Sequence, residues 1–273
     1  KMSKSLGNVI SPSTIVQGGT LQSTKTKGKG KKAKRQTVST PIPAYGADVL
    51  RLFVASSDYT TDIPVSSQAL VKAKELLRRI RNTLRFLVGN TSTPPTSGGS
   101  PDGGEIVPEY SPVDSYILHR SRQFKSNIED HYNNFQISKV CQSVGEFCIS
   151  DLSALYFTSV KDRLYCDAVD SPSRVAVLKV LRTLYSVILH SVSPIVCFTA
   201  EEVHEHVSQN QNGESVFETI QSGKIFDIRE LNYDYPVHEF STVLEVRKHL
   251  LQRLEKERQL KTISRPASVS FCF

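Results

Sequence analysis

The stretch SQALVKAKELLRRIRNTLRFLVG, residues 67–89, decides the fold class of this chain. Its apolar residues recur three and four positions apart, the spacing that places side chains on one face of an α-helix. Basic residues recur along another face. The stretch therefore predicts one long amphipathic helix. Its apolar face comprises Leu70, Ala73, Leu77, Ile80, Leu84, Leu87 and Val88, and its basic face Lys74, Arg78, Arg81 and Arg85.

Helical patterns dominate on both sides of this stretch. Ser11 followed by Pro12 offers an N-cap and a first-turn proline, which predicts a short helix over 12–17. Val49, Leu52 and Phe53 follow helical spacing within 45–59. Up-down packing of the helices is the economical arrangement. Further helices are expected at 112–131, 134–162, 172–192, 200–207 with a Thr199–Glu202 capping box, and 243–261, before a short strand at 267–273.

Composition limits the possible functions. With 273 residues and 38% hydrophobic content, the chain can bury a core of one large or two modest domains. Its five cysteines form no C-x-x-C pair and no Cys/His cluster at zinc spacing, so we expect reduced, structural thiols and no zinc. We expect no apolar run near the roughly 20 residues that a membrane span needs, and therefore no membrane partner.

Positive charge is concentrated at the N-terminal end. The net charge is +7, yet no Asp or Glu precedes Asp48. Residues 18–43 consist mainly of Gly, Lys, Ser and Thr, which predicts a mobile basic loop. One interpretation is a nonspecific contact with a tRNA backbone, and the alternatives are a tolerated surface insertion or a nuclear-localisation signal. The candidate contacts are Lys29, Lys31, Lys32 and Lys34.

The first ten residues, KMSKSLGNVI, carry phosphate-handling chemistry. Two lysines lie three positions apart beside small hydroxyls, and Gly7 permits unusual backbone angles. The run resembles the second signature loop of class I aminoacyl-tRNA synthetases. The resemblance implies catalytic roles for Lys1 and Lys4, binding of ATP with Mg²⁺, and stabilisation by Lys4 of the charge that grows on the leaving phosphates. The implied ATP-binding residues are Lys1, Met2, Ser3, Lys4 and Ser5.

Three further motifs narrow the resemblance to the isoleucyl-tRNA synthetase family. Residues 46–51, GADVLR, are general to several class I synthetases, but the continuation VASSDYTTD at 54–62 resembles the isoleucyl enzymes. The run RIRNT at 79–83 resembles the family's helix that links the catalytic side to the anticodon-binding bundle. Residues 160–165, VKDRLY, resemble the bacterial and mitochondrial type.

Two groups of side chains are candidates for tRNA contact. Arg78, Arg81 and Arg85 can form phosphate forks, although an arginine stripe is also typical of a solvated helix face. In the second group, Lys161 and Arg163 suit phosphate and Tyr165 suits stacking on an unpaired base. The alternative is that Asp162 pairs with Arg163 or a neighbouring helix, and that Tyr165 belongs to the core.

The resemblance implies a mainly α fold, in which a signature-loop and stem-contact segment is followed by an anticodon-binding α-helical bundle. The expected domains are the end of a class I catalytic domain (1–66), the bundle (67–238), and a terminal helix with the start of a C-terminal junction (239–273). Because a catalytic loop stands at residue 1, we expect the C-terminal part of a longer enzyme.

The full enzyme would ligate isoleucine to isoleucine tRNA with ATP, as a monomer in the mitochondrial matrix or, alternatively, in the cytoplasm. The chain alone is predicted to be inactive. Two rival classes stay open: a non-catalytic RNA-binding paralogue and a related synthetase, chiefly valyl.

Overall fold

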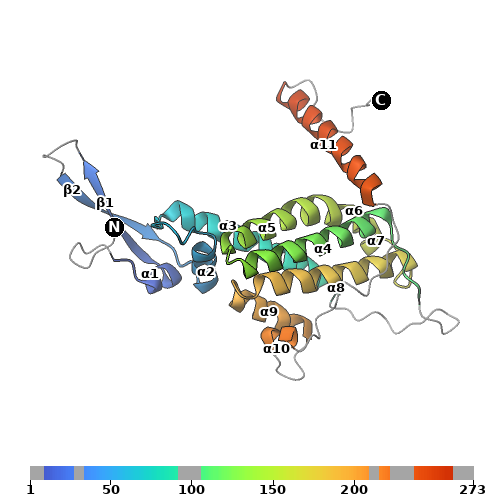
Figure 1. Cartoon of the computed structure of the whole chain (residues 1–273), viewed down its shortest axis with the longest axis horizontal. Coiled ribbons are helices and arrows are strands. Elements are labelled where there is room, and N and C mark those ends of the chain that lie inside the picture. The colour runs from blue at the N-terminus through green and yellow to red at the C-terminus, as the bar shows by residue number, and fades with distance from the viewer. Residues whose placement is uncertain (1–8, 28–33, 92–105, 209–214, 222–236, 261–273) are drawn as a thin grey trace.

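The computed structural model describes residues 9–27, 34–91, 106–208, 215–221 and 237–260. Within these residues the chain is an elongated, mainly helical molecule with a single two-stranded sheet. Figure 1 shows the hairpin at one end, the helical bundle at the other, and a long helix joining them. The expectation of a mainly α fold is confirmed, whereas the predicted terminal strand at 267–273 lies outside the described residues.

The long helix α3 (Ser67–Thr91) forms as its periodicity predicts. Leu70, Ile80, Leu84 and Leu87 are each at most 2% exposed, so the predicted apolar face is the buried face. The two helices before it are α1 (Pro12–Gln17) and α2 (Ala47–Ala55). Glycine is required at position 46, because the backbone enters α2 with φ of 83° there.

The predicted mobile loop at 18–43 is wrong for its described residues, 18–27 and 34–43, which contain two strands. Strands β1 (Gly19–Lys27) and β2 (Lys34–Ile42) pair antiparallel, with Gly19 opposite Ile42 and Lys27 opposite Lys34. The ladder pairs the backbone donors and acceptors that face the partner strand, in a segment that has few apolar residues, and its threonines suit a strand. Leu21 and Ile42 are buried at the base of the hairpin and fix it to the helices.

The bundle contains α4 (Pro112–Asn133), α5 (Ile137–Glu146) and α8 (Pro172–Val192). The helix predicted at 134–162 is not uniform, because α5 continues as a π-helix, Phe147–Tyr156, and then as the short α6 (Phe157–Ser159). Each π turn takes up more residues than an α turn, which changes the direction of the following side chains. The motif-bearing α7 (Lys161–Tyr165) comes after a break at Val160.

The expectation that no apolar run is long enough to span a membrane is wrong for helix α8. By length and composition it could cross a membrane, with a mean hydropathy of 1.5, although 67% of the apolar window is buried inside the protein. Its apolar residues pack against α3 and α4 in the bundle core. Central position in the bundle therefore accounts for its composition.

The last described helices are α9 (Cys197–Ser208), α10 (Val216–Gln221) and α11 (Val237–Gln259). The predicted Thr199–Glu202 capping box is wrong, because α9 begins at Cys197 and both side chains bond to other helices. Helix α11 begins six residues earlier than predicted. It contacts α4, where the ring centroids of Tyr116 and Phe240 lie 5.0 Å apart.

Candidate nucleic-acid interface

Helix α7 divides its five side chains between solvent and core. Leu164 is buried, whereas Lys161, Asp162 and Tyr165 are exposed, Tyr165 to 64%. Lys161 and Tyr165 lie four residues apart, so they share one face of the helix. The alternative interpretation of Tyr165 as a core residue is therefore wrong, and an ammonium group and an aromatic ring stand together at the surface.

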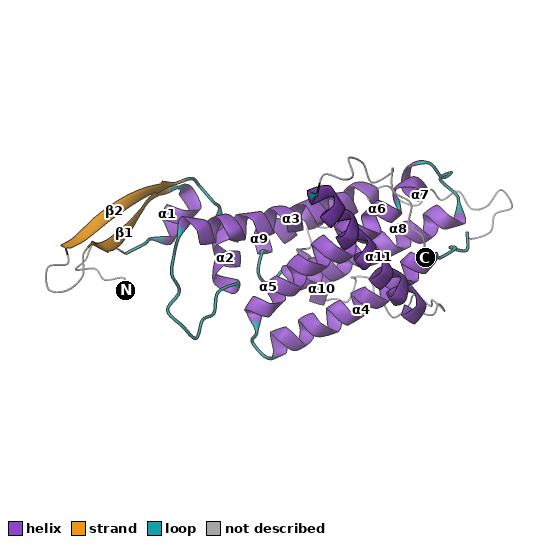
Figure 2. Cartoon of the chain, turned by 90° about the horizontal axis from the view of Figure 1, so that it is seen from above, coloured by secondary structure: helices purple, strands orange, loops and turns teal. Residues whose placement is uncertain are grey.

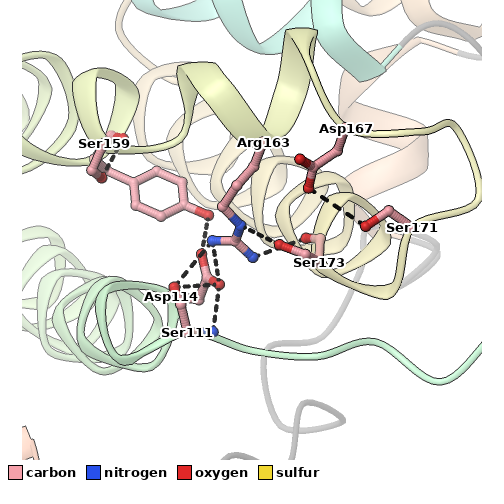
Figure 3. Close-up of polar contacts among 8 residues, drawn as sticks. Ser111, Asp114, Ser159, Arg163, Asp167, Ser171 and Ser173 are labelled. Atoms are coloured by element: carbon pink, nitrogen blue, oxygen red, sulfur yellow. Dashed lines mark hydrogen bonds and ion pairs between the residues drawn. The ribbon is translucent and has the colours of Figure 1, made fainter.

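Arg163 points the other way, into a polar network between three helices (Figure 3). Its Nη1 lies 2.8 Å from Asp114 Oδ2 and donates to Ser111 Oγ at 3.0 Å. Its Nε and Nη2 donate to the hydroxyl and the carbonyl of Ser173, at 2.7 and 2.8 Å. Ser111 precedes α4 and Ser173 lies in the first turn of α8, so Arg163 ties α7 to the starts of both helices.

Asp114 is the centre of this network. Its side chain is fully buried, and one of its oxygens accepts hydrogen bonds from both the N–H and the hydroxyl of Ser111, each at 2.8 Å. Its other oxygen accepts from the Tyr156 hydroxyl at 2.8 Å. Burial, and then the adjacent carboxylate, raises the pKa of Tyr156 well above its usual value, which keeps this hydroxyl protonated as a donor.

The network corrects the expected pairing of Arg163 with Asp162 and shows how the guanidinium is directed. Its charged partner is Asp114 on α4, 49 positions earlier, and Asp162 takes no part. Its donors are also directed at protein oxygens rather than at solvent, with only 17% of the side chain exposed. Four of the five N–H groups of the guanidinium are occupied by these contacts, so the structure gives Arg163 an architectural place. It does not bring Arg163 together with Lys161 and Tyr165 on one surface.

The three candidate arginines of α3, Arg78, Arg81 and Arg85, also differ in their contacts. Arg78 donates two hydrogen bonds to Glu75, and these bonds together with Arg79 lower the pKa of Glu75 to about 2. Arg81 makes a two-bond pair with Glu202 of α9, at 2.7 and 2.9 Å. Arg85 is exposed and has no hydrogen bond or ion pair within the described parts of the chain. Arg85 is therefore the stripe's available guanidinium.

Most of the other predicted site residues lie outside the described part of the chain. Lys1, Met2, Ser3, Lys4 and Ser5 lie outside the described residues, as do Lys29, Lys31 and Lys32. Lys34 begins β2, paired with Lys27, and only its backbone is described. Across the described ranges, no three His, Cys, Asp or Glu side chains form a group that could hold a metal ion.

Sequence reasoning missed two polar residues of α2, Asp48 and Arg51. Asp48 is only 7% exposed, and its Oδ2 accepts from the N–H and the hydroxyl of Thr199, at 2.7 and 2.6 Å. Arg51 donates to the carbonyls of Pro194 and Ile195, at 2.9 and 2.7 Å. A carboxylate in the first turn of an apolar helix, as at Asp48, is the signal in the sequence that indicates such a partner.

Two family matches cover the hairpin end and the bundle. Residues 1–66 match the family described as tRNA synthetases class I (I, L, M and V). Residues 114–271, more than half of the chain, match the family described as the anticodon-binding domain of tRNA ligase. The chain belongs to the anticodon-binding domain family of tRNA ligases. Asp114, its partners Tyr156 and Arg163, and the exposed face of α7 all lie within this match.

Individual relatives confirm the resemblance to isoleucyl enzymes of bacterial and mitochondrial type. The chain is 36% identical over 220 residues to the mitochondrial isoleucine–tRNA ligase of Gallus gallus, covering 80% of this chain and 20% of the relative. It is 35% identical over 217 residues to the isoleucine–tRNA ligase of Prochlorococcus marinus (strain MIT 9211), with the same coverage. For the isoleucine–tRNA ligase of Thermotoga petrophila, identity is 32% over 265 residues, covering 96% and 25%. The chain thus spans about a fifth to a quarter of the length of these curated relatives.

Proposed function

We propose that the chain is part of an isoleucine–tRNA ligase, which activates isoleucine with Mg-ATP and transfers it to isoleucine tRNA. Support comes from the two family matches and from relatives that are all named isoleucine–tRNA ligase. In this proposal residues 1–66 supply the ATP-side loop, 67–238 the anticodon-binding bundle, and 239–273 the terminal helix and junction. Lys1 to Ser5 contact ATP, with Lys1 and Lys4 catalytic.

Two finer assignments belong to the same proposal. The protein acts as a monomer, and its compartment is the mitochondrial matrix, with the cytoplasm as the alternative. The mitochondrial relatives are 36% identical to the chain, and the bacterial relative from Prochlorococcus marinus is 35% identical. This similarity is compatible with the mitochondrial matrix and with the cytoplasm.

The tRNA surface of the bundle is proposed to include Lys161 and Tyr165. The observation that carries this assignment is the exposed pairing of an ammonium group and an aromatic ring on one face of α7. Lysine suits a phosphate and tyrosine suits the face of an unstacked base. Arg163 contributes indirectly, because its contacts hold α7 against α4 and α8. Arg85, and the hairpin lysines Lys29, Lys31, Lys32 and Lys34, are further proposed backbone contacts.

The assignment predicts distinct effects for the two residues. Lys161→Ala should weaken tRNA binding and reduce the slope of log K against log salt by about one, because one phosphate contact is lost. Tyr165→Ala should cost about 1–3 kcal/mol of binding free energy with little change in salt slope, because a stacking contact is lost. Both are measured by fluorescence anisotropy with labelled isoleucine tRNA across a salt series.

A matched control is Lys139→Ala. Lys139 is an exposed lysine near the start of α5, close to the turn where the Tyr59 hydroxyl bonds to the Phe135 carbonyl, at the other end of α4 from Ser111. The Lys139→Ala substitution removes the same positive charge as Lys161→Ala, but from the opposite end of the bundle. Equal losses for Lys139→Ala and Lys161→Ala would show that only total charge matters, and would remove α7 from the proposed surface.

A further inference from the structure

The buried side chains form two large hydrophobic clusters that meet at α2 and α3. One cluster holds the base of the hairpin and includes Ile15, Leu21 and Ile42. The other fills the bundle. Helix α2 contributes Val49 and Phe53 to the first cluster and Leu52 to the second, and partly buried Leu77 of α3 packs against both. Figure 2 shows the hairpin end and the bundle on opposite sides of this region.

Asp48 crosses between the two parts at the start of α9. Thr199, whose N–H and hydroxyl both bond to Asp48, is the third residue of α9. The N–H at this position has no partner within its own helix, and a negative charge is favourable at a helix N-terminus. Helix α9 is therefore capped by a carboxylate 151 positions earlier in the chain, in place of the capping box that its own sequence predicts.

Arg51, one turn after Asp48, contacts the connection between α8 and α9. Its guanidinium donates to the two successive carbonyls of Pro194 and Ile195, which follow the last residue of α8. Hydrogen bonds from a charged donor such as guanidinium are stronger than those between neutral groups. One turn of α2 thus places a carboxylate at the start of α9 and a guanidinium on the connection that leads into α9.

The third contact comes from α3. Arg81 pairs with Glu202 through two hydrogen bonds, and its Nη1 also lies 3.4 Å from Thr199 Oγ1. Arg81 lowers the pKa of Glu202, so this carboxylate stays ionised at neutral pH. Side chains from α2 and α3 therefore hold the start of α9, its middle at Glu202, and the connection between α8 and α9, and these contacts lie near the place where the two hydrophobic clusters meet.

We propose that Asp48, Arg51 and Arg81 are positioning residues of an orienting joint, which fixes the hairpin end of the chain at one angle to the bundle. The inference rests on the proposed function for its purpose: a tRNA that contacts both parts must meet them at a set separation. The joint itself is defined by the contacts with Thr199, Pro194, Ile195 and Glu202. Arg81 accordingly belongs to the joint and not to the tRNA surface.

The test is a distance measurement between the two parts by pulsed electron paramagnetic resonance. Spin labels are placed at exposed Gln17→Cys in α1 and at exposed Cys166 after α7, with Cys197 and Cys272 replaced by serine. The joint predicts one narrow distance distribution in the otherwise unchanged chain. Asp48→Ala broadens it, and Asp48→Asn, whose amide oxygen can still accept from Thr199, restores most of the narrow component.

A reference pair within the bundle, Lys139→Cys with Cys166, should keep its distribution in every variant. An Asp48→Ala distribution as narrow as the unchanged chain's, or equal broadening of the reference pair, would overturn the joint. If Asp48→Ala does not fold, Arg51→Ala combined with Arg81→Ala carries the same prediction. Isoleucine tRNA binding is measured separately, so a chain that binds no tRNA would defeat the proposed function while the distances still decide the joint.

Discussion

At the scale of single residues, the cysteines illustrate how burial controls chemistry. Cys141 and Cys148 are buried in the bundle core, and this burial raises the pKa of each thiol to about 11. A rise of about two units leaves roughly a hundredfold less thiolate at a given pH. Cys166 is exposed. These thiols fit the structural role expected from the sequence.

We predict that iodoacetamide at pH 8 modifies Cys166 in the folded chain well before Cys141 or Cys148. The two buried thiols should react only after denaturation in urea, because unfolding restores their access to water and their ordinary pKa. Peptide mass spectrometry after timed quenching measures the order. Rapid modification of either buried cysteine in the native protein would contradict the burial described here.

At the scale of elements, the Asp114 network joins α4, α7 and α8 through one guanidinium. Removing one partner of a buried ion pair leaves the other charge without compensation, which costs about 3–5 kcal/mol. We therefore predict that Arg163→Ala lowers the free energy of unfolding by about this amount in urea titrations. Lys161→Ala, two residues away but exposed, should change it by less than about 0.5 kcal/mol.

The pair of variants separates architecture from binding. Lys161→Ala should impair tRNA binding at unchanged stability, whereas Arg163→Ala should impair both because α7 loses its attachment. If Arg163→Ala unfolded at the same urea concentration as the unchanged chain, Arg163 would not hold the helices together and the phosphate role would return.

Elements with a complete local pattern were predictable from the sequence. Helix α3 followed its apolar spacing, and Ser11 with Pro12 correctly placed α1. The hairpin was missed because strands β1 and β2 have little apolar alternation, so their pairing depends on backbone hydrogen bonds and on two buried residues at the base. The π-helix was missed because its apolar residues recur at a spacing close to that of an α-helix. The pattern therefore does not show that each turn holds an extra residue.

The site was less predictable, because its partners are distant in the sequence. The direction of Arg163 depends on Asp114, and the N-terminus of α9 depends on Asp48, 151 positions before Thr199. Local reasoning assigned both to nearer residues. Tyr165 is exposed because α7 turns its other face, with Leu164 and Arg163, toward the bundle. That orientation requires the packed bundle, and five residues alone cannot specify it.

At the scale of the whole molecule, the chain combines a positively charged hairpin end with an anticodon-binding bundle. Charge alone can bind any nucleic acid, with an affinity that falls as salt rises, because the counterion release that accompanies binding becomes less favourable. Recognition of one tRNA needs contacts with particular unstacked bases, which salt weakens much less. The two contributions are therefore separable by a salt series.

The most direct test of the central claim compares isoleucine tRNA with a noncognate tRNA across that series, using the 273-residue chain. We expect a preference for isoleucine tRNA that persists as salt rises, because the proposed bundle surface contacts the anticodon arm. Equal affinity for the two tRNAs, lost together at high salt, would contradict it and reduce the chain to a nonspecific binder of nucleic-acid backbones.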